Sequence, residues 1–494
     1  MHTFRSSVRR GVSLGAVVAL LGACAVGPDF VRPVSPEAER YTREALPEVT
    51  VAADGQAQRF APETAMAAEW WRLFKSAKLD AIVQQAIANN PTLQAAEASL
   101  RQSQDNLRAG QGVFYPQAEA GLDGRRERTA PSQQGLSTTG TIFSLVTLSG
   151  TISYALDVFG GERRTVEGLR AQTDYARYES KAAYLTLTAN VVNTAIARAA
   201  YSAQIRATDQ LIELEIQQLH ATEAQVRAGT VSYASVLGMR SLIAANQASL
   251  APLKQKADQA EHLLAILEGV VPSKATLPDI DLSELSLPVD LPVSLPSDLV
   301  RERPDILAAE AQLHLASANI GVATAAMFPS FSLSGTYGAA GSSFSKLSAS
   351  ESRFWNIGPS ATIPVFQGGQ LWFGRRAAID AYQQSQASYR QAVLGAFAQV
   401  ADSLNALEHD AEALQALVEA QRTAAEALSL LQVNYRAGLV AYLEVLAADV
   451  QFHAASVAYL QAVAQRHQDT VGLFVALGGG WWDGPKPAGK GEAR

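Results

Sequence analysis

The longest pattern in the chain is a repeat of apolar residues over 393–428, at steps that alternate between four and three. A period of 3.5 residues is typical of long helices that lie side by side. No proline occurs between residues 365 and 484, and proline is the residue that most strongly interrupts a helix. The pattern therefore predicts one very long helix over 370–437, followed by a shorter helix over 441–477.

A second pattern, in which apolar residues alternate with small polar ones, predicts strands. It is clearest over 142–158, where Ile152, Tyr154 and Leu156 share one face and Ser153 lies on the other. This pattern fits a strand that faces lipid, although a half-buried strand of a soluble sheet looks the same. The other predicted strands cover 114–128, 328–340 and 354–366.

The chain also contains an internal repeat. Residues 90–98 resemble residues 303–311, and the sequence Arg-Ala-Gly occurs at 227–229 and again at 436–438. These and other matches keep their order, and the members of each pair are separated by about 210 residues. The matches indicate a tandem duplication. Each half is predicted to contain two helices, two strands, a very long helix and a shorter helix.

The two halves set the organisation of the chain. The first half covers 69–271 and the second covers 297–480, and a proline-rich linker over 272–296, expected to be extended, joins them. Residues 481–494 form a C-terminal tail. The helices of the first half that correspond to 370–437 and 441–477 are predicted over 162–227 and 233–268. Both long helices end at Arg-Ala-Gly, where a glycine in the left-handed conformation would end the helix.

The N-terminus has the pattern of a secretory signal. Arginines precede an apolar run over 11–23, which is too short to span a bilayer. The run ends in Leu-Gly-Ala followed by Cys24, the pattern at which lipoprotein precursors are cleaved and lipidated. We therefore expect a signal peptide at 1–23, a lipid on Cys24 and a tether over 24–68, the alternative being an ordinary signal peptide with an incidental cysteine. Ala25, where inner-membrane lipoproteins usually have aspartate, favours the outer membrane of a Gram-negative cell.

Composition and candidate chemistry argue against an enzyme. The net charge of −7 offers no general attraction to nucleic acid, and a single cysteine excludes an internal disulfide. The histidines form no metal-ligand spacing with acidic residues. Ser343 and Lys346 have the spacing of a Ser-x-x-Lys motif, but its partner motifs are missing. We expect no catalytic residues, no metal and no cofactor.

The strand count requires more than one copy of the chain. No stretch after residue 23 is apolar enough for a membrane-spanning helix, so a membrane crossing would use strands in a closed barrel. Even small membrane barrels have about eight strands, whereas each chain is predicted to supply four. Two or three copies would therefore share one barrel.

Several motifs resemble those of a known family. The run from Cys24 to Pro33, the segment Arg301–Ile306, the two Arg-Ala-Gly turns and the closing segment Ala476–Trp481 are similar to those of outer-membrane efflux lipoproteins of the NodT type, in the TolC-like superfamily. The resemblance covers nearly the whole mature chain. It implies a homotrimer of mixed α and β structure, with a twelve-stranded transmembrane barrel that continues into a long α-helical barrel across the periplasm.

The resemblance also implies a function. The trimer would be the exit duct of a tripartite efflux pump and would conduct small molecules, such as drugs or toxic organics, from the periplasm to the exterior. Its partners would be a periplasmic adaptor protein and an inner-membrane pump, commonly of the resistance-nodulation-division class. A structural or adhesive trimeric surface lipoprotein and a type I protein-secretion channel are the alternatives.

The resemblance places a gate at the periplasmic tip, next to the Arg-Ala-Gly turns. The candidate gate residues are Tyr435, Arg436, Leu443, Glu444 and Asp449. The family often has an aspartate where this chain has Ala447, and the sequence leaves open whether Asp449 substitutes for it from another face of the helix. The candidate adaptor-contacting residues are Arg227, Ala228, Gly229, Arg436, Ala437 and Gly438.

Overall fold

The computed structural model describes residues 25–38, 40–44, 47–62, 66–130, 139–294 and 296–481. The predicted signal peptide, Cys24 and residues 482–494 of the predicted tail lie outside these ranges. The chain divides into two compact units. The first covers Met1–Pro33, Leu100–Ala176 and Ala309–Tyr389, and the second covers the remaining segments.

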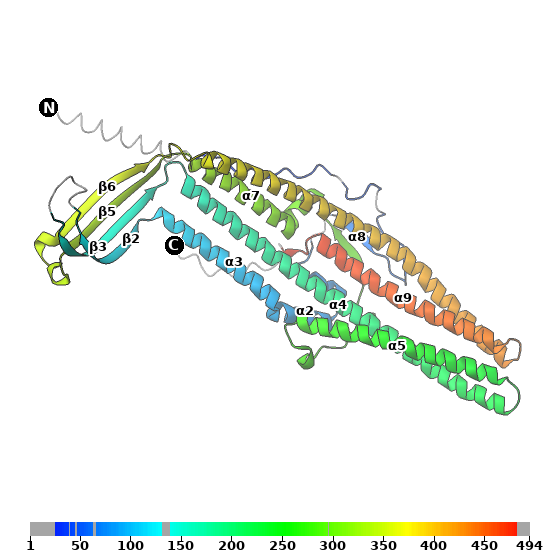
Figure 1. The fold of residues 1–494 in the computed structure, drawn as a ribbon. Coiled ribbons are helices and arrows are strands. Elements are labelled where there is room, and N and C mark those ends of the chain that lie inside the picture. The colour runs from blue at the N-terminus through cyan, green and yellow to red at the C-terminus, as the bar shows by residue number, and fades with distance from the viewer. Residues whose placement is uncertain are drawn as a thin grey trace. The chain divides into compact units, whose positions relative to one another are not determined.

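The first unit contains a four-stranded antiparallel sheet (Figure 1). Its strands, in spatial order, are β2 (Gln117–Arg128), β3 (Ile142–Leu156), β5 (Ser330–Gly341) and β6 (Arg353–Thr362). The pairing of β3 with β5 joins the two halves of the sequence, and the hydroxyl oxygens of Thr151 and Thr336 lie 3.1 Å apart across it. Within the described residues, β2 and β6 each have a strand partner on one side only.

The strand limits differ by up to four residues from the predicted 114–128, 142–158, 328–340 and 354–366, and three of the differences have a clear physical reason. Strand β2 begins after a 3₁₀ helix (Gln111–Phe114). Strand β3 ends at Leu156 because Asp157 instead accepts hydrogen bonds from the backbone N–H groups of Glu162 and Arg163, at 3.0 Å each, which satisfies donors at the start of the next helix. Strand β6 ends at Thr362, shortly before Pro364, a residue that has no N–H group for a strand ladder.

The described residues between 25 and 33 belong to the first unit and make specific contacts within it, although the sequence predicts a tether there. The Val26 N–H donates to the Phe159 carbonyl at 3.0 Å. The buried guanidinium of Arg164 donates to Asp29 at 2.7 Å, and Arg32 donates to Glu310 at 2.7 Å. Backbone and charged groups in this segment therefore have partners that an extended tether would lack.

The remaining helices belong to the second unit or extend into it. The second unit contains α2 (Ala77–Asn89), α5 (Tyr233–Leu267), α6 (Pro296–Glu302) and α9 (Tyr442–Ala476). The helices α3 (Pro91–Gly110), α4 (Gly161–Arg227), α7 (Pro304–Ala325) and α8 (Gln370–Arg436) contribute residues to both units. Among the described residues, no helix combines the length and the apolar content that a membrane-spanning helix needs.

The core of the second unit includes the completely buried aromatic residues Trp70, Trp71, Phe74 and Phe474. Burial of one such ring removes about 150–250 Å² from water. The first three lie on a short 3₁₀ helix (Trp70–Phe74), and Phe474 lies near the end of α9. These rings therefore attach the first helices of the chain to its last helix.

Two segments that the sequence predicts as tether and linker pair with each other in the second unit. Strand β1 (Arg59–Pro62) lies parallel to β4 (Asp290–Val293). The buried Gln58 side chain donates to the Pro288 carbonyl and to Thr470 of α9, at 3.0 Å each. The β4 part of the predicted linker over 272–296 has the extended conformation expected there, and polar groups at Gln58 and Pro288 bond across the two segments and to α9.

Candidate functional site at the ends of the helical hairpins

Each long helix ends in the same turn. The Thr230 N–H donates to the Gln225 carbonyl, and the Gly229 N–H donates to the Val226 carbonyl, both at 3.0 Å. Leu439 and Gly438 make the matching bonds to Asn434 and Tyr435 at the end of α8, at 2.9 Å each. Both glycines have φ of +75°, so each turn is a Schellman motif with glycine in the left-handed position. The chain then reverses into α5 or α9, which forms two helical hairpins.

The two hairpins contact each other through an apolar cluster near these turns. Met239 of α5, Leu428 of α8, and Tyr442 and Val445 of α9 are buried together. Leu428 belongs to the 3.5-residue repeat that the sequence shows over 393–428. The cluster therefore joins the two halves of the duplication near the ends of both hairpins.

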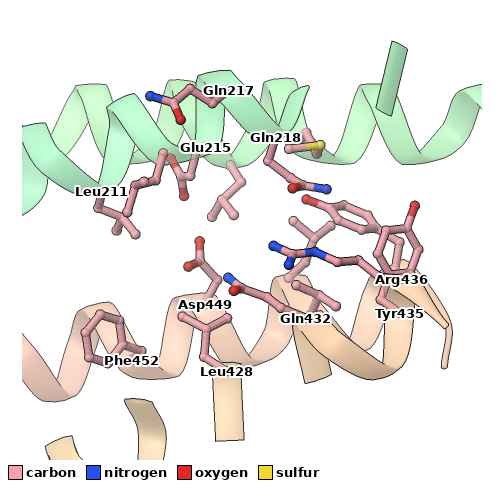
Figure 2. A pocket seen from close by; sticks show the side chains of 16 residues that line it. Leu211, Glu215, Gln217, Gln218, Leu428, Gln432, Tyr435, Arg436, Asp449 and Phe452 are labelled. Atoms are coloured by element: carbon pink, nitrogen blue, oxygen red, sulfur yellow. The ribbon is translucent and has the colours of Figure 1, made fainter. Parts of the chain in front are cut away.

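A cavity of about 320 Å³ lies beside this cluster. Residues of α4, α5, α8 and α9 line it, and its polar side chains include Gln218, Gln432 and Arg436 (Figure 2). All four helices contribute to it within the second unit. The cavity is the place where both halves of the chain bring polar groups together next to the Arg-Ala-Gly turns.

Tyr435 connects the two hairpins at one end of the cavity. Its hydroxyl donates to Oε1 of Gln225, on α4, at 3.1 Å. Its ring lies 5.1 Å from that of Tyr442, at an interplanar angle of 59°. Burial raises the pKa of the Tyr435 hydroxyl, so the proton that makes the bond to Gln225 stays in place at physiological pH.

Two carboxyl groups face each other at the other end of the cavity. Glu215 of α4 and Asp449 of α9 point toward one another (Figure 2). Glu215 is only 6% exposed. Its Oε1 accepts a hydrogen bond from Nδ2 of Asn246 at 2.7 Å, whereas Oε2 is buried without a partner in the described structure.

Burial and proximity shift the acidities of this pair. Burial, followed by the contact with Asp449, raises the pKa of Glu215 to about 8. Burial also raises the pKa of Asp449. Both effects disfavour the charged form of Glu215, because desolvation and a neighbouring like charge penalise ionisation. For Asp449 burial is the largest effect, and the contact with Glu215 and the charge of His453 act in the opposite direction.

The structure brings together only some of the predicted site residues. Tyr435, Arg436 and Asp449 all line the cavity. Leu443 is 74% exposed, and Glu444 is also exposed, so these two side chains lie outside it. The residues of the two turns, Arg227, Ala228, Gly229, Arg436, Ala437 and Gly438, are all exposed.

Sequence reasoning did not find Glu215 or Asn246. Both lie inside regular helical segments and belong to no motif, and the residues about 210 positions later in the second half are Ala424 and Ala455. A polar residue in one half opposite alanine in the other is the signal that could have identified them. Among the described residues, no group of three or more His, Cys, Asp or Glu side chains could hold a metal ion.

The fold has well-determined relatives among solved structures. The outer-membrane channel OprN superposes with a TM-score of 0.83 at 26% identity, over 93% of this chain and 100% of that one. The open state of the MtrE outer-membrane channel of Neisseria gonorrhoeae superposes with a TM-score of 0.78 at 25% identity, over 93% of this chain and 99% of that one. The fold therefore defines a channel protein of the outer membrane.

Sequence comparison makes the assignment more specific. The chain belongs to the outer membrane efflux protein family, whose model matches residues 82–270 and 295–479. It is 30% identical over 423 residues to the pyoverdine export outer membrane protein OpmQ of Pseudomonas aeruginosa. The matched region covers 84% of this chain and 87% of OpmQ.

These findings confirm the main predictions. The predicted family and the mixed α and β fold class are confirmed. The chain is an outer-membrane exit duct of an efflux pump, located in the outer membrane of a Gram-negative cell and extending into the periplasm. Its family consists of channel proteins.

Proposed function

We propose that three copies of the chain form a passive duct that conducts small molecules from the periplasm to the exterior, with no chemical step of its own. The sheet of the first unit carries this proposal. Leu148, Ile152 and Leu156 of β3 are between 43% and 57% exposed although they are apolar. Alternating apolar side chains on an outer face fit a strand that contacts lipid.

The edges of the sheet support sharing between copies. Strands β2 and β6 have 12 and 10 residues, and an exposed edge of that length presents unpaired backbone groups to any available strand. Pairing β6 of one copy with β2 of the next satisfies both edges. Three copies then supply twelve strands, which is within the range of known barrels.

The pump partners in this proposal are a periplasmic adaptor protein and an inner-membrane pump of the resistance-nodulation-division class. The exposed turn residues Arg227, Ala228 and Gly229, with Arg436, Ala437 and Gly438, are the proposed adaptor contacts. The two turns have the same backbone geometry and end with the same residues, so one adaptor surface can recognise either turn.

The proposed cargo is a small molecule supplied by the pump. The similarity to OpmQ, which is named for the export of pyoverdine, supports this class of cargo. A lipid on Cys24 would attach the chain to the membrane independently of the strands. Because covalent lipidation adds about 0.8 kcal/mol per buried methylene group, it would strengthen anchoring without taking part in transport.

The proposed gate lies at the hairpin ends. Tyr435 links α8 to Gln225 of α4, so the second hairpin cannot move away from the first without breaking this bond. Leu443, Glu444 and Arg436 are exposed beside it, and three copies of each around a symmetry axis could narrow the duct by size or by charge. Asp449 takes part through its contact with Glu215.

Conductance in planar lipid bilayers tests the proposal. Purified protein is expected to insert as a trimer with a small conductance, and the double variant Leu443→Ala/Arg436→Ala is expected to conduct more. Tyr233→Phe, which changes an exposed tyrosine of the first hairpin, is the control and is expected to conduct like the unmodified protein. Absence of conductance in all three proteins would exclude passive conduction by the trimer.

A second measurement separates small-molecule efflux from type I protein secretion. Deletion of the gene is expected to raise the accumulation of dyes and drugs inside the cell without changing the set of secreted proteins. Loss of one secreted protein with unchanged dye accumulation would instead favour secretion.

A further inference from the structure

We propose that Glu215 and Asp449 share a single proton that holds α4 of the first half against α9 of the second, so that loss of this proton loosens the contact between the hairpins. The proposal deepens the proposed gate and depends on it for its effect on conduction. Its ligand is the proton itself. The site is the contact between two carboxyl groups from different halves of the chain, beside the cavity of about 320 Å³ (Figure 2).

The geometry of the two carboxyl groups requires the proton. Glu215 is 6% exposed and lies on α4, and Asn246 of α5 satisfies only its Oε1. Its Oε2 is buried without a donor in the described structure and lies next to the carboxyl group of Asp449. Two ionised carboxylates at this place would leave buried oxygen atoms without hydrogen bonds and would repel each other. One shared proton removes both penalties by making a hydrogen bond between α4 and α9.

The neighbouring groups in the described structure supply little compensating positive charge. On α9, burial lowers the pKa of His453 and so disfavours its charged form, whereas the charge of a protonated His453 lowers the pKa of Asp449. Tyr442 is uncharged. On α8, Tyr435 is uncharged, and Arg436 lines the same cavity but forms no ion pair with either carboxyl group in the described structure. On α5, the residues that line the cavity are Met239 and Leu242, and Asn246 contacts Glu215 as a neutral donor.

The direction of the pH dependence follows from these acidities. The pKa of Glu215 is raised from 4.5 to about 8 in the closed arrangement, and that of Asp449 is also raised. Between pH 4.5 and about pH 8, Glu215 binds a proton while the two hairpins are in contact, whereas a solvated Glu215 has lost it. The contact between the hairpins is therefore strongest below about pH 4.5 and weakens as the pH rises toward about 8.

Amide hydrogen exchange of the intact trimer measures this contact directly. The protection factors of α9 around Asp449, which are already corrected for the intrinsic effect of pH, are expected to fall by up to about tenfold per pH unit between roughly pH 5 and pH 8. In Glu215→Gln the side-chain amide can donate to Asp449 as the protonated acid does. This variant is expected to keep high, pH-independent protection.

Two further variants serve as a control and as a second test of the pair. Glu213→Gln removes the same charge two residues earlier on α4, where the side chain is exposed, and is expected to keep the pH dependence of the unmodified protein. Asp449→Asn is expected to behave like Glu215→Gln and serves as the second variant if Glu215→Gln fails to assemble. A pH dependence that survives in both Glu215→Gln and Asp449→Asn would overturn the proposal.

Infrared spectroscopy provides a readout of the proton itself. Asp469, whose pKa is raised to about 7 by burial and by Asp410, contributes to the same spectral region, so difference spectra provide the readout. At neutral pH the unmodified protein minus Glu215→Gln is expected to show the carbonyl stretching band of a protonated carboxylic acid, and the unmodified protein minus Glu213→Gln is expected to show none. Absence of the band from the first difference spectrum would overturn the shared proton.

Conductance separates this proposal from the proposed function. A protein that shows the infrared band and pH-dependent protection but never conducts would exclude the duct and leave the shared proton standing. A protein that conducts, but whose protection factors do not change with pH, would exclude the shared proton and leave the duct standing. If both proposals hold, the open fraction rises with pH in the unmodified protein and in Glu213→Gln, and stays constant in Glu215→Gln.

Discussion

The two hairpin ends come from one duplicated sequence, yet they differ in what they bury. Both long helices end in Arg-Ala-Gly and in the same Schellman turn, with glycine φ of +75° in each copy. The tyrosine that follows behaves differently in the two copies. Tyr233 is 55% exposed at the start of α5, whereas Tyr442 is 7% exposed at the start of α9 and contacts Tyr435.

The charges near these ends differ in sign. Arg240 of α5 and Asp449 of α9 occupy corresponding positions in the repeat. Arg240 is exposed and donates to Glu223 at 2.8 Å on the surface of its own hairpin. Asp449 instead meets Glu215 of the other half beside the cavity. Equivalent positions of the repeat therefore form a solvated ion pair in the first half and a contact between the hairpins in the second half.

This difference shows which properties a duplication preserves. The residues that determine backbone geometry, such as the turn glycines, are the same in both copies. The residues that join the first half of the chain to the second half differ between the halves. An interface between two halves of one chain is not symmetric, so the residues on its two sides can change separately. The function of a hairpin end therefore depends on positions where the repeat fails.

The largest expected difference between the two ends concerns the tyrosines. Tyr442→Ala removes a buried ring from the apolar cluster with Met239 and Leu428, and we expect it to cost about 3–5 kcal/mol. Tyr233→Ala at the exposed position is expected to change stability by less than about 0.5 kcal/mol. Local unfolding free energies from amide exchange of α5 and α9 measure both. Equal costs would mean that the two ends are equivalent in the assembled protein.

Substitution of the two turn glycines is expected to change stability equally, in contrast to substitution of the two tyrosines. Gly229→Ala and Gly438→Ala both force a side chain into the left-handed conformation, at a cost of about 1–2 kcal/mol. Apart from the chain neighbours, no atom of the described residues lies within 4 Å of the added Cβ at either position, so backbone strain is the main cause. Gly395→Ala, inside α8 and equally open, is expected to stabilise by up to about 1 kcal/mol. Thermal unfolding of the three variants measures the difference, and unequal effects at 229 and 438 would contradict it.

The sequence predicts the parts of this fold that depend on local patterns. The apolar repeat over 393–428 lies in α8 (Gln370–Arg436), and the glycine of each Arg-Ala-Gly has the predicted left-handed conformation. The alternation at Ile152 and Leu156 lies in β3. Helical period, strand period and glycine conformation are properties of a few consecutive residues, so they can be read without the rest of the chain.

The contacts between distant segments could not be predicted in this way. The bonds from Gln58 to Pro288 and to Thr470 join segments that have no periodic pattern, and the sequence therefore suggested a tether and a linker. Glu215 is one acidic residue among several on a long helix, and its burial depends on Asn246 and Asp449 from two other helices. The gate and adaptor roles of the turn residues stay predictions.

A smaller effect is expected from the hydrogen bond between the hairpins. Tyr435→Phe keeps the ring contact with Tyr442 but removes the bond to Gln225, which is 3.1 Å long. The loss is expected to cost about 0.5–1.5 kcal/mol, so the open fraction in bilayer recordings should rise by roughly two- to tenfold. Tyr233→Phe, at the exposed tyrosine of the first hairpin, is the matched control. An unchanged open fraction in Tyr435→Phe would show that this bond does not hold the hairpins together.

The smallest effect is expected at the exposed ion pair of the first hairpin. Glu223→Gln removes the partner of Arg240, but both groups are solvated, and water and salt screen such pairs almost completely. We therefore expect no measurable change in stability, in conductance or in their pH dependence, and no effect of raised salt. The matched comparison is Glu215→Gln, which makes the same chemical change on the same helix at a buried position. A pH-independent duct in Glu223→Gln would mean that the first hairpin end, rather than the second, carries the group that responds to pH.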